Sequence, residues 1–204
     1  MKIASWNVNS VKARLPHLLT FLKDAQPDIV CLQETKCLTA DFPMLEAKAL
    51  GYHVEAIGQR AYNGVALLSK LTPSEIVCGL PGNAEDEQPR YIEASFGEVR
   101  VASVYLPNGN PVDTDKFTYK LTWMERLVDH TRDLLRQEIP FVLAGDYNIC
   151  PTDDDVYDPV AFRDDALCRL EARARFRALL YLGLTDALIG SLEVEPARLV
   201  TRAV

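Results

Sequence analysis

The sequences LQETK at residues 32–36 and GDYN at residues 145–148 decide the fold. Each follows a run of apolar residues, IVCL at 29–32 and FVLA at 141–144, and such runs predict buried strands. Glu34 and Asp146 therefore stand at the carboxyl ends of two strands, where open α/β sheets bind their ligands. Two carboxylates at one sheet edge suit a hard divalent cation, which can hold a phosphate and stabilise a leaving oxygen. The pair indicates part of a metal-dependent phosphoesterase site.

The bulk composition is that of one globular domain. The chain has 204 residues, of which 48% are hydrophobic and 25% charged. It contains no apolar run of the ~20 residues that a membrane helix needs, and no apolar signal core at its N-terminus. We therefore expect a cytoplasmic protein that is not bound to a membrane.

Cysteine usage and charge argue against a zinc cluster, a disulfide framework and a protein that binds nucleic acid by charge alone. The five cysteines are spread along the chain without C-x-x-C spacing, which argues against a zinc cluster and against a disulfide framework. The net charge of −7 argues against a protein that binds nucleic acid by charge alone. It does not exclude a metal-dependent nuclease, because a bound cation supplies the local positive charge where a phosphate docks.

Hydrophobic periodicity and turn residues outline the elements. Strands are expected at 2–8, 29–34, 52–57, 64–69, 90–96, 99–106 and 141–146, and helices at 16–25, 117–135 and 167–182. Strands separated by helices, together with hairpins, predict a mixed α/β sandwich. Residues 189–204 show no clear period and no obvious strand.

Five motifs in order resemble the bacterial exonuclease III family of the endonuclease/exonuclease/phosphatase superfamily. They are WNVNSVKAR at 6–14, LQETK at 32–36, YNGVAL at 62–67, VYLPNG at 104–109 and GDYNICPTD at 145–153. The resemblance covers residues 1–188, which we expect to form one domain followed by an unmatched tail at 189–204. It implies an α/β (α+β type) four-layered sandwich of two mixed β-sheets flanked by helices.

The same resemblance implies an activity, a cofactor and a partner. The activity is Mg²⁺- or Mn²⁺-dependent cleavage of duplex DNA from 3′ to 5′, with incision at abasic sites. The partner is double-stranded DNA, especially with abasic or 3′-blocked ends, and the protein is expected to be a monomer.

The resemblance also implies a role for each matching residue. Glu34 would be the main metal ligand, Asn7 would help to hold the metal or its waters, and Asp146 and Asn148 would complete the set. Tyr105 would contact the scissile phosphate, Asp146 would transfer a proton and Asn148 would stabilise charge on the phosphate. Contacts to the DNA backbone are expected from Lys12, Arg14, Asn63 and Arg90. Without the motifs, the simplest interpretation of Tyr105 is an aromatic residue at a strand end, and that of Arg90 is an ordinary solvated arginine.

Two further motifs of the family do not occur in the sequence. They are an arginine–x–aspartate strand and a serine–aspartate–histidine–x–proline segment. The histidines of this chain, His17, His53 and His130, lie in helical or strand patterns and are expected to be structural or exposed. We therefore expect the sandwich to lack its C-terminal strands and catalysis by this chain to be weak or absent. The alternatives are a non-catalytic metal- or DNA-binding remnant and a superfamily phosphatase that acts on a non-DNA phosphoester.

Overall fold

The computed structural model describes residues 1–187 and 199–202, whose strands form two stacked mixed sheets. The first sheet has the order β1-β2-β4-β3. Its strands are β1 (Ile3–Asn7), β2 (Ile29–Gln33), β3 (His53–Ile57) and β4 (Val65–Ser69). β1 runs parallel to β2, whereas β2 and β3 each pair antiparallel with β4.

The second sheet has the order β5-β6-β7-β8-β10-β9. Its strands are β5 (Ser74–Cys78), β6 (Tyr91–Phe96), β7 (Val99–Tyr105), β8 (Phe141–Asp146), β9 (Thr185–Asp186) and β10 (Leu199–Arg202). β5, β6 and β7 form an antiparallel unit, and β7, β8, β10 and β9 run parallel.

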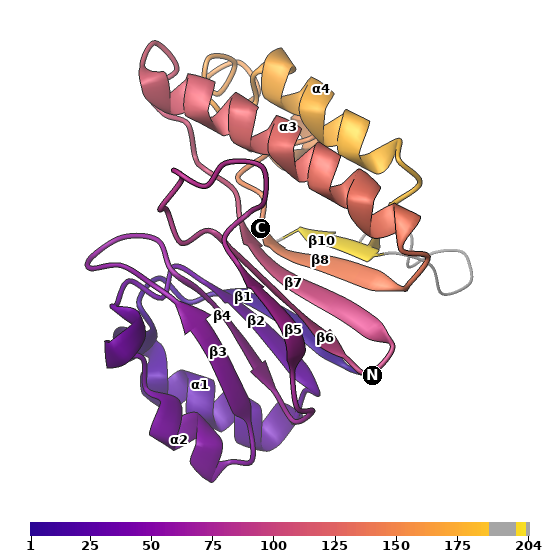
Figure 1. Cartoon of the computed structure of the whole chain (residues 1–204). Coiled ribbons are helices and arrows are strands. Elements are labelled where there is room, and N and C mark those ends of the chain that lie inside the picture. The colour runs from indigo at the N-terminus through magenta and orange to yellow at the C-terminus, as the bar shows by residue number, and fades with distance from the viewer. Residues whose placement is uncertain (188–198, 203–204) are drawn as a thin grey trace.

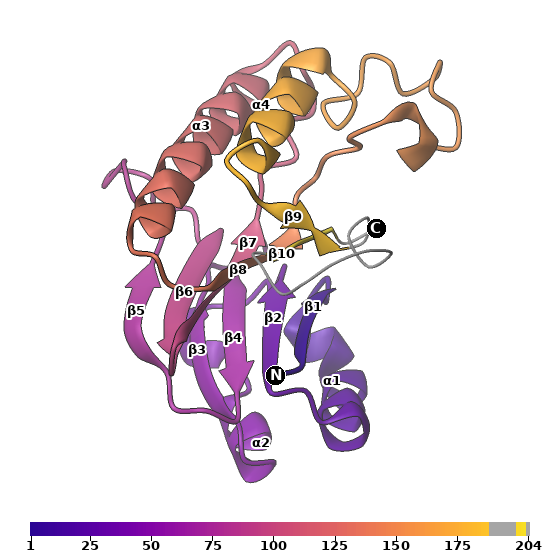
Figure 2. The ribbon, with the colours of Figure 1, turned by 90° about the vertical axis from the view of Figure 1, so that its right-hand side faces the viewer.

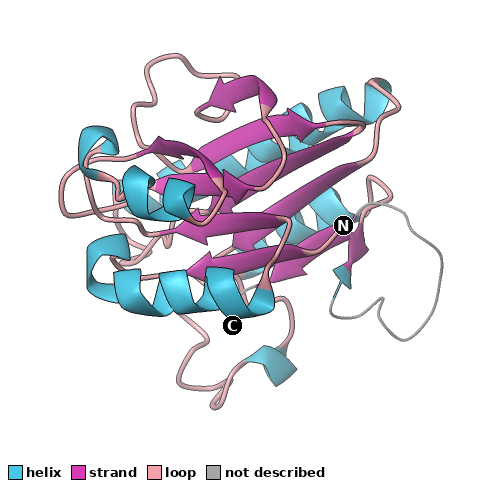
Figure 3. Ribbon diagram, turned by 90° about the horizontal axis from the view of Figure 1, so that it is seen from below, coloured by secondary structure: helices cyan, strands magenta, loops and turns pink. Residues whose placement is uncertain are grey.

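Helices cover the outer faces of both sheets and make the molecule four-layered (Figures 1 and 3). α1 (Val11–Ala25) and α2 (Met44–Ala49) lie on the first sheet, and α3 (Asp115–Arg136) and α4 (Leu170–Leu180) on the second. Short 3₁₀ turns occur at Thr39–Asp41 and Asp153–Asp155. The Ser10 hydroxyl accepts a hydrogen bond from the Ala13 amide at 3.4 Å and caps α1.

The core consists of three apolar layers, one between the two sheets and one under each pair of helices. The central layer includes Ile29 and Leu67 from the first sheet and Phe96, Val101 and Ala144 from the second. Because β2 and β8 both contribute to this layer, the stacking of the sheets holds the two strands in a fixed position relative to each other.

A buried polar cluster bridges β6, β7 and α3. Glu93 is 1% exposed; its carboxylate accepts hydrogen bonds from Arg100 Nε at 3.0 Å and from the Tyr91 hydroxyl. Arg100 binds Glu93 Oε1, and His130 Nε2 lies 3.0 Å from Glu93 Oε2, the oxygen that also accepts from Tyr91. Each buried charge of this cluster therefore has a partner, as a buried charge requires.

Most of the expected elements are confirmed, including the two mixed sheets and their flanking helices. The structure adds β5, β9 and α2, and it starts α1 earlier than expected, at Val11 rather than Pro16. The expectation that residues 189–204 contain no strand is wrong, because β10 at Leu199–Arg202 pairs between β8 and β9 (Figure 2). The rest of that tail lies outside the described residues, and the boundary at 188 stays a prediction. Among the described residues, no helix has the length and hydropathy needed to cross a bilayer.

Replacing Gly145 with alanine is expected to destabilise the fold by about 3 kcal/mol, with a fall in Tm of roughly 6–12 °C. A Cβ atom at this position would lie 1.9 Å from the carbonyl oxygen of Val104, which belongs to the backbone of neighbouring β7 and cannot rotate away. Thermal melting followed by circular dichroism measures the effect. Gly51→Ala is the control, because a Cβ there meets nothing within 4 Å and costs only the backbone strain of about 1–2 kcal/mol. Equal losses in the two variants would contradict the predicted close approach.

Candidate active site

The two signature carboxylates meet at the carboxyl ends of β2 and β8, and a single amide group joins them. The Nδ2 atom of Asn7 donates to Glu34 Oε1 at 2.8 Å and to Asp146 Oδ2 at 2.8 Å. Asn7 ends β1, Glu34 follows β2 and Asp146 ends β8, so the contact links the two sheets. Figure 2 shows β1 and β2 running towards the region of β8 and β10. The sequence-predicted meeting of Glu34, Asp146 and Asn7 is therefore found in the structure.

The backbone turns sharply at Glu34. Its φ of 53° is left-handed, which is uncommon for a residue other than glycine. The carbonyl of Glu34 accepts from the Ser10 amide at 2.7 Å, and the Thr35 amide donates to Gly64 at 3.1 Å. Such conformations persist where the surroundings hold them, and they cluster at functional sites.

The two carboxyl groups have different electrostatic surroundings. Burial by itself raises the pKa of Glu34, but hydrogen bonds from Asn7, Lys36 and Tyr105 outweigh it, and the pKa lies below the ordinary value. Burial raises the pKa of Asp146 and outweighs its hydrogen bonds from Asn148 and Asn7. Lys36 Nζ lies 2.8 Å from Glu34 Oε2 and compensates part of the negative charge. Glu34 is thus held as a carboxylate, whereas Asp146 takes up a proton more readily than an ordinary aspartate.

Asn148 lies beside Asp146, and both the nitrogen and the oxygen of its side-chain amide are hydrogen-bonded. Its backbone amide donates to Asp146 Oδ1 at 2.9 Å, and its φ is 43°. Its Nδ2 donates to the carbonyl of Leu106 at 2.9 Å, and its Oδ1 accepts from Asn108 Nδ2 at 3.2 Å. Asn108 and Asn148 therefore present a fixed pair of amides next to the carboxylates.

Tyr105 and Arg90 form the third side of the site. Tyr105 ends β7 and is the register partner of Asp146 on β8. Its hydroxyl hydrogen-bonds to Glu34, and burial raises the pKa of the phenol well above its ordinary value. The guanidinium of Arg90 stacks over the Tyr105 ring, 4.9 Å from the ring centroid. Neutral tyrosine can therefore donate a hydrogen bond beside a positive charge, which is what an anionic substrate group requires.

The proposed DNA contacts divide into two sets. Asn63 is 9% exposed, and its Nδ2 donates to Gln88 Oε1 at 3.3 Å; the same oxygen accepts from Arg90 Nε at 2.7 Å. Asn63 and Arg90 are thus connected through Gln88. Lys12 and Arg14 lie on the exposed first turn of α1, where Lys12 pairs with Asp41 at 3.4 Å. They are not in contact with the carboxylates.

Sequence reasoning missed several residues that hold the site together. Lys36 and Asn108 lie inside the LQETK and VYLPNG motifs, so the motifs contained the signal. No motif marked Gln88. Lys120 was marked in another way, because it is a charged residue on the buried face of α3, between Phe117 and Met124.

The oxygen donors at this position fit a magnesium or manganese ion. Mg²⁺ is commonly held by one or two carboxylates and otherwise by waters and substrate phosphates. The site offers the carboxylates of Glu34 and Asp146, which here accept hydrogen bonds from the neutral amide of Asn7, and Glu34 also pairs with the ammonium of Lys36. Within the described residues, no three His, Cys, Asp or Glu side chains form a cluster, as a denser metal cage would require.

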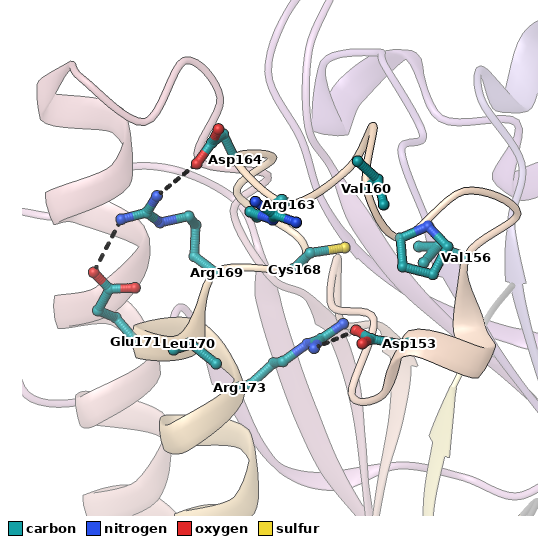
Figure 4. A pocket seen from close by; sticks show the side chains of 11 residues that line it. Asp153, Val156, Val160, Arg163, Asp164, Cys168, Arg169, Leu170, Glu171 and Arg173 are labelled. Atoms are coloured by element: carbon teal, nitrogen blue, oxygen red, sulfur yellow. Dashed lines mark hydrogen bonds and ion pairs between the residues drawn. The ribbon is translucent and has the colours of Figure 1, made fainter.

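A separate cavity of about 630 Å³ lies in the segment between the 3₁₀ turn at Asp153–Asp155 and the first turn of α4 (Figure 4). Arg173 pairs there with Asp153 at 2.8 Å, and Arg169 pairs with Asp164 at 3.1 Å and with Glu171 at 3.3 Å. None of the predicted site residues is among the described residues that line it. Its ion pairs connect residues within the segment 153–173.

Comparison with known proteins decides the family. The family described as Endonuclease/Exonuclease/phosphatase family matches residues 4–194. The chain belongs to this family. The match contains every residue of the carboxylate site and extends past the expected domain boundary at 188.

Three relatives show how far the similarity reaches. Exodeoxyribonuclease III of Haemophilus influenzae is 36% identical over 161 residues, which are 76% of this chain and 60% of that protein. An AP endonuclease structure from Archaeoglobus fulgidus is 36% identical with a TM-score of 0.88, over 92% of this chain and 73% of that one. The 3′ phosphatase NExo from Neisseria, solved with a product DNA hairpin, is 41% identical with a TM-score of 0.90 over 98% and 76% of the two chains. The present chain thus spans less than two thirds of the Haemophilus relative and about three quarters of the solved chains.

Proposed function

We propose that this protein is a metal-dependent phosphodiesterase of the exonuclease III type that acts on duplex DNA. The proposed reactions are 3′ to 5′ degradation, incision at abasic sites and removal of blocking groups at 3′ ends. The observation that carries the proposal is the Asn7 amide shared by Glu34 and Asp146, beside Tyr105. The activities for which the three relatives are named support the substrate class.

The residues take the following roles in the proposal. Glu34 binds Mg²⁺ or Mn²⁺, with Asp146 and Asn148 beside it, and Asn7 orients the two carboxylates through its amide nitrogen. The ion, when bound, would neutralise phosphate charge and stabilise the leaving oxygen. When the phosphate binds, Tyr105 turns its hydroxyl proton from Glu34 to the scissile phosphate and donates a hydrogen bond to it. Asp146 exchanges a proton with the attacking water or the leaving group, for which its raised pKa suits it.

Asn148 and the basic residues complete the proposed binding surface. Asn148 stabilises charge on the phosphate through its amide. Arg90 and Asn63 bind the phosphates next to the site, and Lys12 and Arg14 bind the backbone farther along the duplex. Such contacts position DNA without reading its sequence.

A second candidate is binding of metal and DNA without turnover. It is favoured by the place of the histidines, which among the described residues lie away from the carboxylates. His130 is engaged by Glu93, His53 lies on β3 and His17 on α1. A group that activates water at this site therefore has to come from Asp146 or from outside the described residues.

A duplex with one abasic site and a labelled strand tests the proposed function. We expect the purified chain to nick the labelled strand at the abasic site with Mg²⁺ or Mn²⁺, and excess EDTA to abolish the nick. Glu34→Gln protein, purified in parallel, controls for contaminating nucleases. Metal-dependent binding of the duplex without a nick would select the second candidate. A nick that persists in EDTA, or the absence of both binding and cleavage, would refute the metal-dependent DNA site.

A further inference from the structure

Lys120 is a buried cation that the proposed reaction does not use. It lies in the first half of α3 and is 0% exposed. Its Nζ donates to three main-chain carbonyls, those of Asn108 at 3.0 Å, Asn148 at 2.6 Å and Ala166 at 3.0 Å. A lysine ammonium has three donors, so each of its protons has an acceptor. A charge buried to this degree is retained only where such partners compensate its lost hydration.

The three carbonyls belong to three different loops. Asn108 follows β7, Asn148 follows β8 and Ala166 precedes α4. One ammonium thus connects the loops that surround the carboxyl ends of the parallel strands. Asn110 reinforces the connection, since it donates to Asp165 at 3.1 Å and accepts from the Ala166 amide at 3.0 Å.

Two of these carbonyls belong to the residues that form the amide pair of the site. Asn108 Nδ2 donates to Asn148 Oδ1 at 3.2 Å, and Lys120 holds the main chain of both partners. Asn148 has a left-handed φ of 43°, which its surroundings must maintain. The loop also packs on the lysine stem, because a Cβ at Gly109 would lie 2.7 Å from Lys120 Cδ.

We propose that Lys120 is a positioning residue of the active site, which fixes the Asn108–Asn148 amide pair by holding the main-chain carbonyls of both residues. It does not touch the substrate and acts through Asn148. Three convergent carbonyls require a compact group with three donors at the end of a flexible stem, which a lysine ammonium supplies. The proposal rests on the proposed function only where it concerns the reaction rate; the fixing of the amide pair is independent of it.

The first test measures the amide pair directly. Lys120→Met keeps the stem and removes the three donors, and Thr131→Val is the matched control. Thr131 is also 0% exposed on α3, and its hydroxyl donates to Leu127 within the helix and not to a loop. In ¹⁵N correlation spectra, we expect the side-chain amide signals of Asn108 and Asn148 to shift or broaden in Lys120→Met and to stay unchanged in Thr131→Val. Unchanged signals in Lys120→Met, or equal shifts in both variants, would overturn the proposal.

The second test separates positioning from general loss of stability. In single-turnover incision of the abasic duplex, we expect Lys120→Met to lower the rate at saturating DNA about 100-fold. The DNA Kd should change less than about threefold, because the binding surface is intact. A wild-type chain without incision refutes the proposed function but leaves the amide signals as the test of Lys120. An active wild type with an unimpaired Lys120→Met variant overturns the positioning role.

A second variant covers the case in which Lys120→Met does not fold. Gly109→Ala keeps the ammonium but forces the loop and the lysine stem apart, because the added Cβ would lie 2.7 Å from Lys120 Cδ. We expect it to shift the same two side-chain amide signals. If Gly109→Ala leaves both signals where they are, the loop does not depend on Lys120 and the proposal is wrong.

Discussion

Replacing Glu34 with glutamine is expected to weaken Mn²⁺ binding by about 10- to 100-fold or more and to remove metal-dependent incision. The carboxylate of Glu34 is kept ionised by hydrogen bonds from Asn7, Lys36 and Tyr105, which hold its pKa below the ordinary value. Glutamine has a similar shape but no charge, so the hard cation loses its main oxygen ligand. Electron paramagnetic resonance of free Mn²⁺ during a titration measures the affinity, and the abasic-site duplex measures the rate.

The matched control is Glu55→Gln. Glu55 lies half-buried on β3 of the same sheet, and the substitution changes the net charge by the same amount. It is expected to leave both the Mn²⁺ affinity and the incision rate close to those of the wild type. Equal losses in the two variants would show that net charge, and not coordination by Glu34, controls metal binding.

Replacing Glu93 with glutamine is expected to lower the free energy of unfolding by about 3–5 kcal/mol. Glu93 is 1% exposed, and the substitution removes the buried carboxylate 3.0 Å from Arg100 Nε, which leaves Arg100 only the exposed carboxylate of Glu75 at 3.2 Å. It also removes the partner of His130. Urea unfolding at neutral pH measures the loss, and Glu98→Gln, in the exposed turn between β6 and β7, is the control.

The same carboxyl group predicts how stability depends on pH. Burial by itself raises the pKa of Glu93, but hydrogen bonds from His130 and Tyr91 and the charge of Arg100 outweigh it, so the folded-state pKa lies below the ordinary value. Its stabilisation is therefore complete above the unfolded pKa of about 4.3 and is lost as the pH falls through the folded value. The difference in unfolding free energy between wild type and Glu93→Gln should shrink with acidity. A difference that stays constant between neutral and strongly acidic pH would contradict this linkage.

The sequence allowed the fold to be predicted wherever apolar runs end in polar motifs. The strands before Glu34 and Asp146 were clear because they are buried on both faces, and the long helix over 117–135 was clear from its apolar stripe. β5 was missed because all but one of its residues are exposed, so it has no alternating pattern. β10 was missed because it has only a few residues and no pattern of its own. It is identified as a strand only by its pairing with β8 and β9, which a local sequence pattern does not show.

The sequence predicted which residues belong to the candidate site but not how their side chains are arranged. Motifs named Asn7, Glu34 and Asp146, but the sharing of one amide nitrogen depends on how the sheets stack. Lys120 stood out only as a charge on a buried stripe, and such a charge carries no information on its partners. Its acceptors are main-chain carbonyls, which every residue has, so no side-chain pattern could reveal them.

The bond between Asn7 and Asp146 joins residues 139 positions apart, and they belong to different sheets. An isolated first sheet would hold Asn7 and Glu34 without Asp146, and an isolated second sheet would hold Asp146 alone. A partly folded chain in which the sheets have not yet stacked therefore has no assembled metal site. Affinity for the ion is then a late event in folding, and the appearance of Mn²⁺ binding during refolding would time the closure of the sandwich.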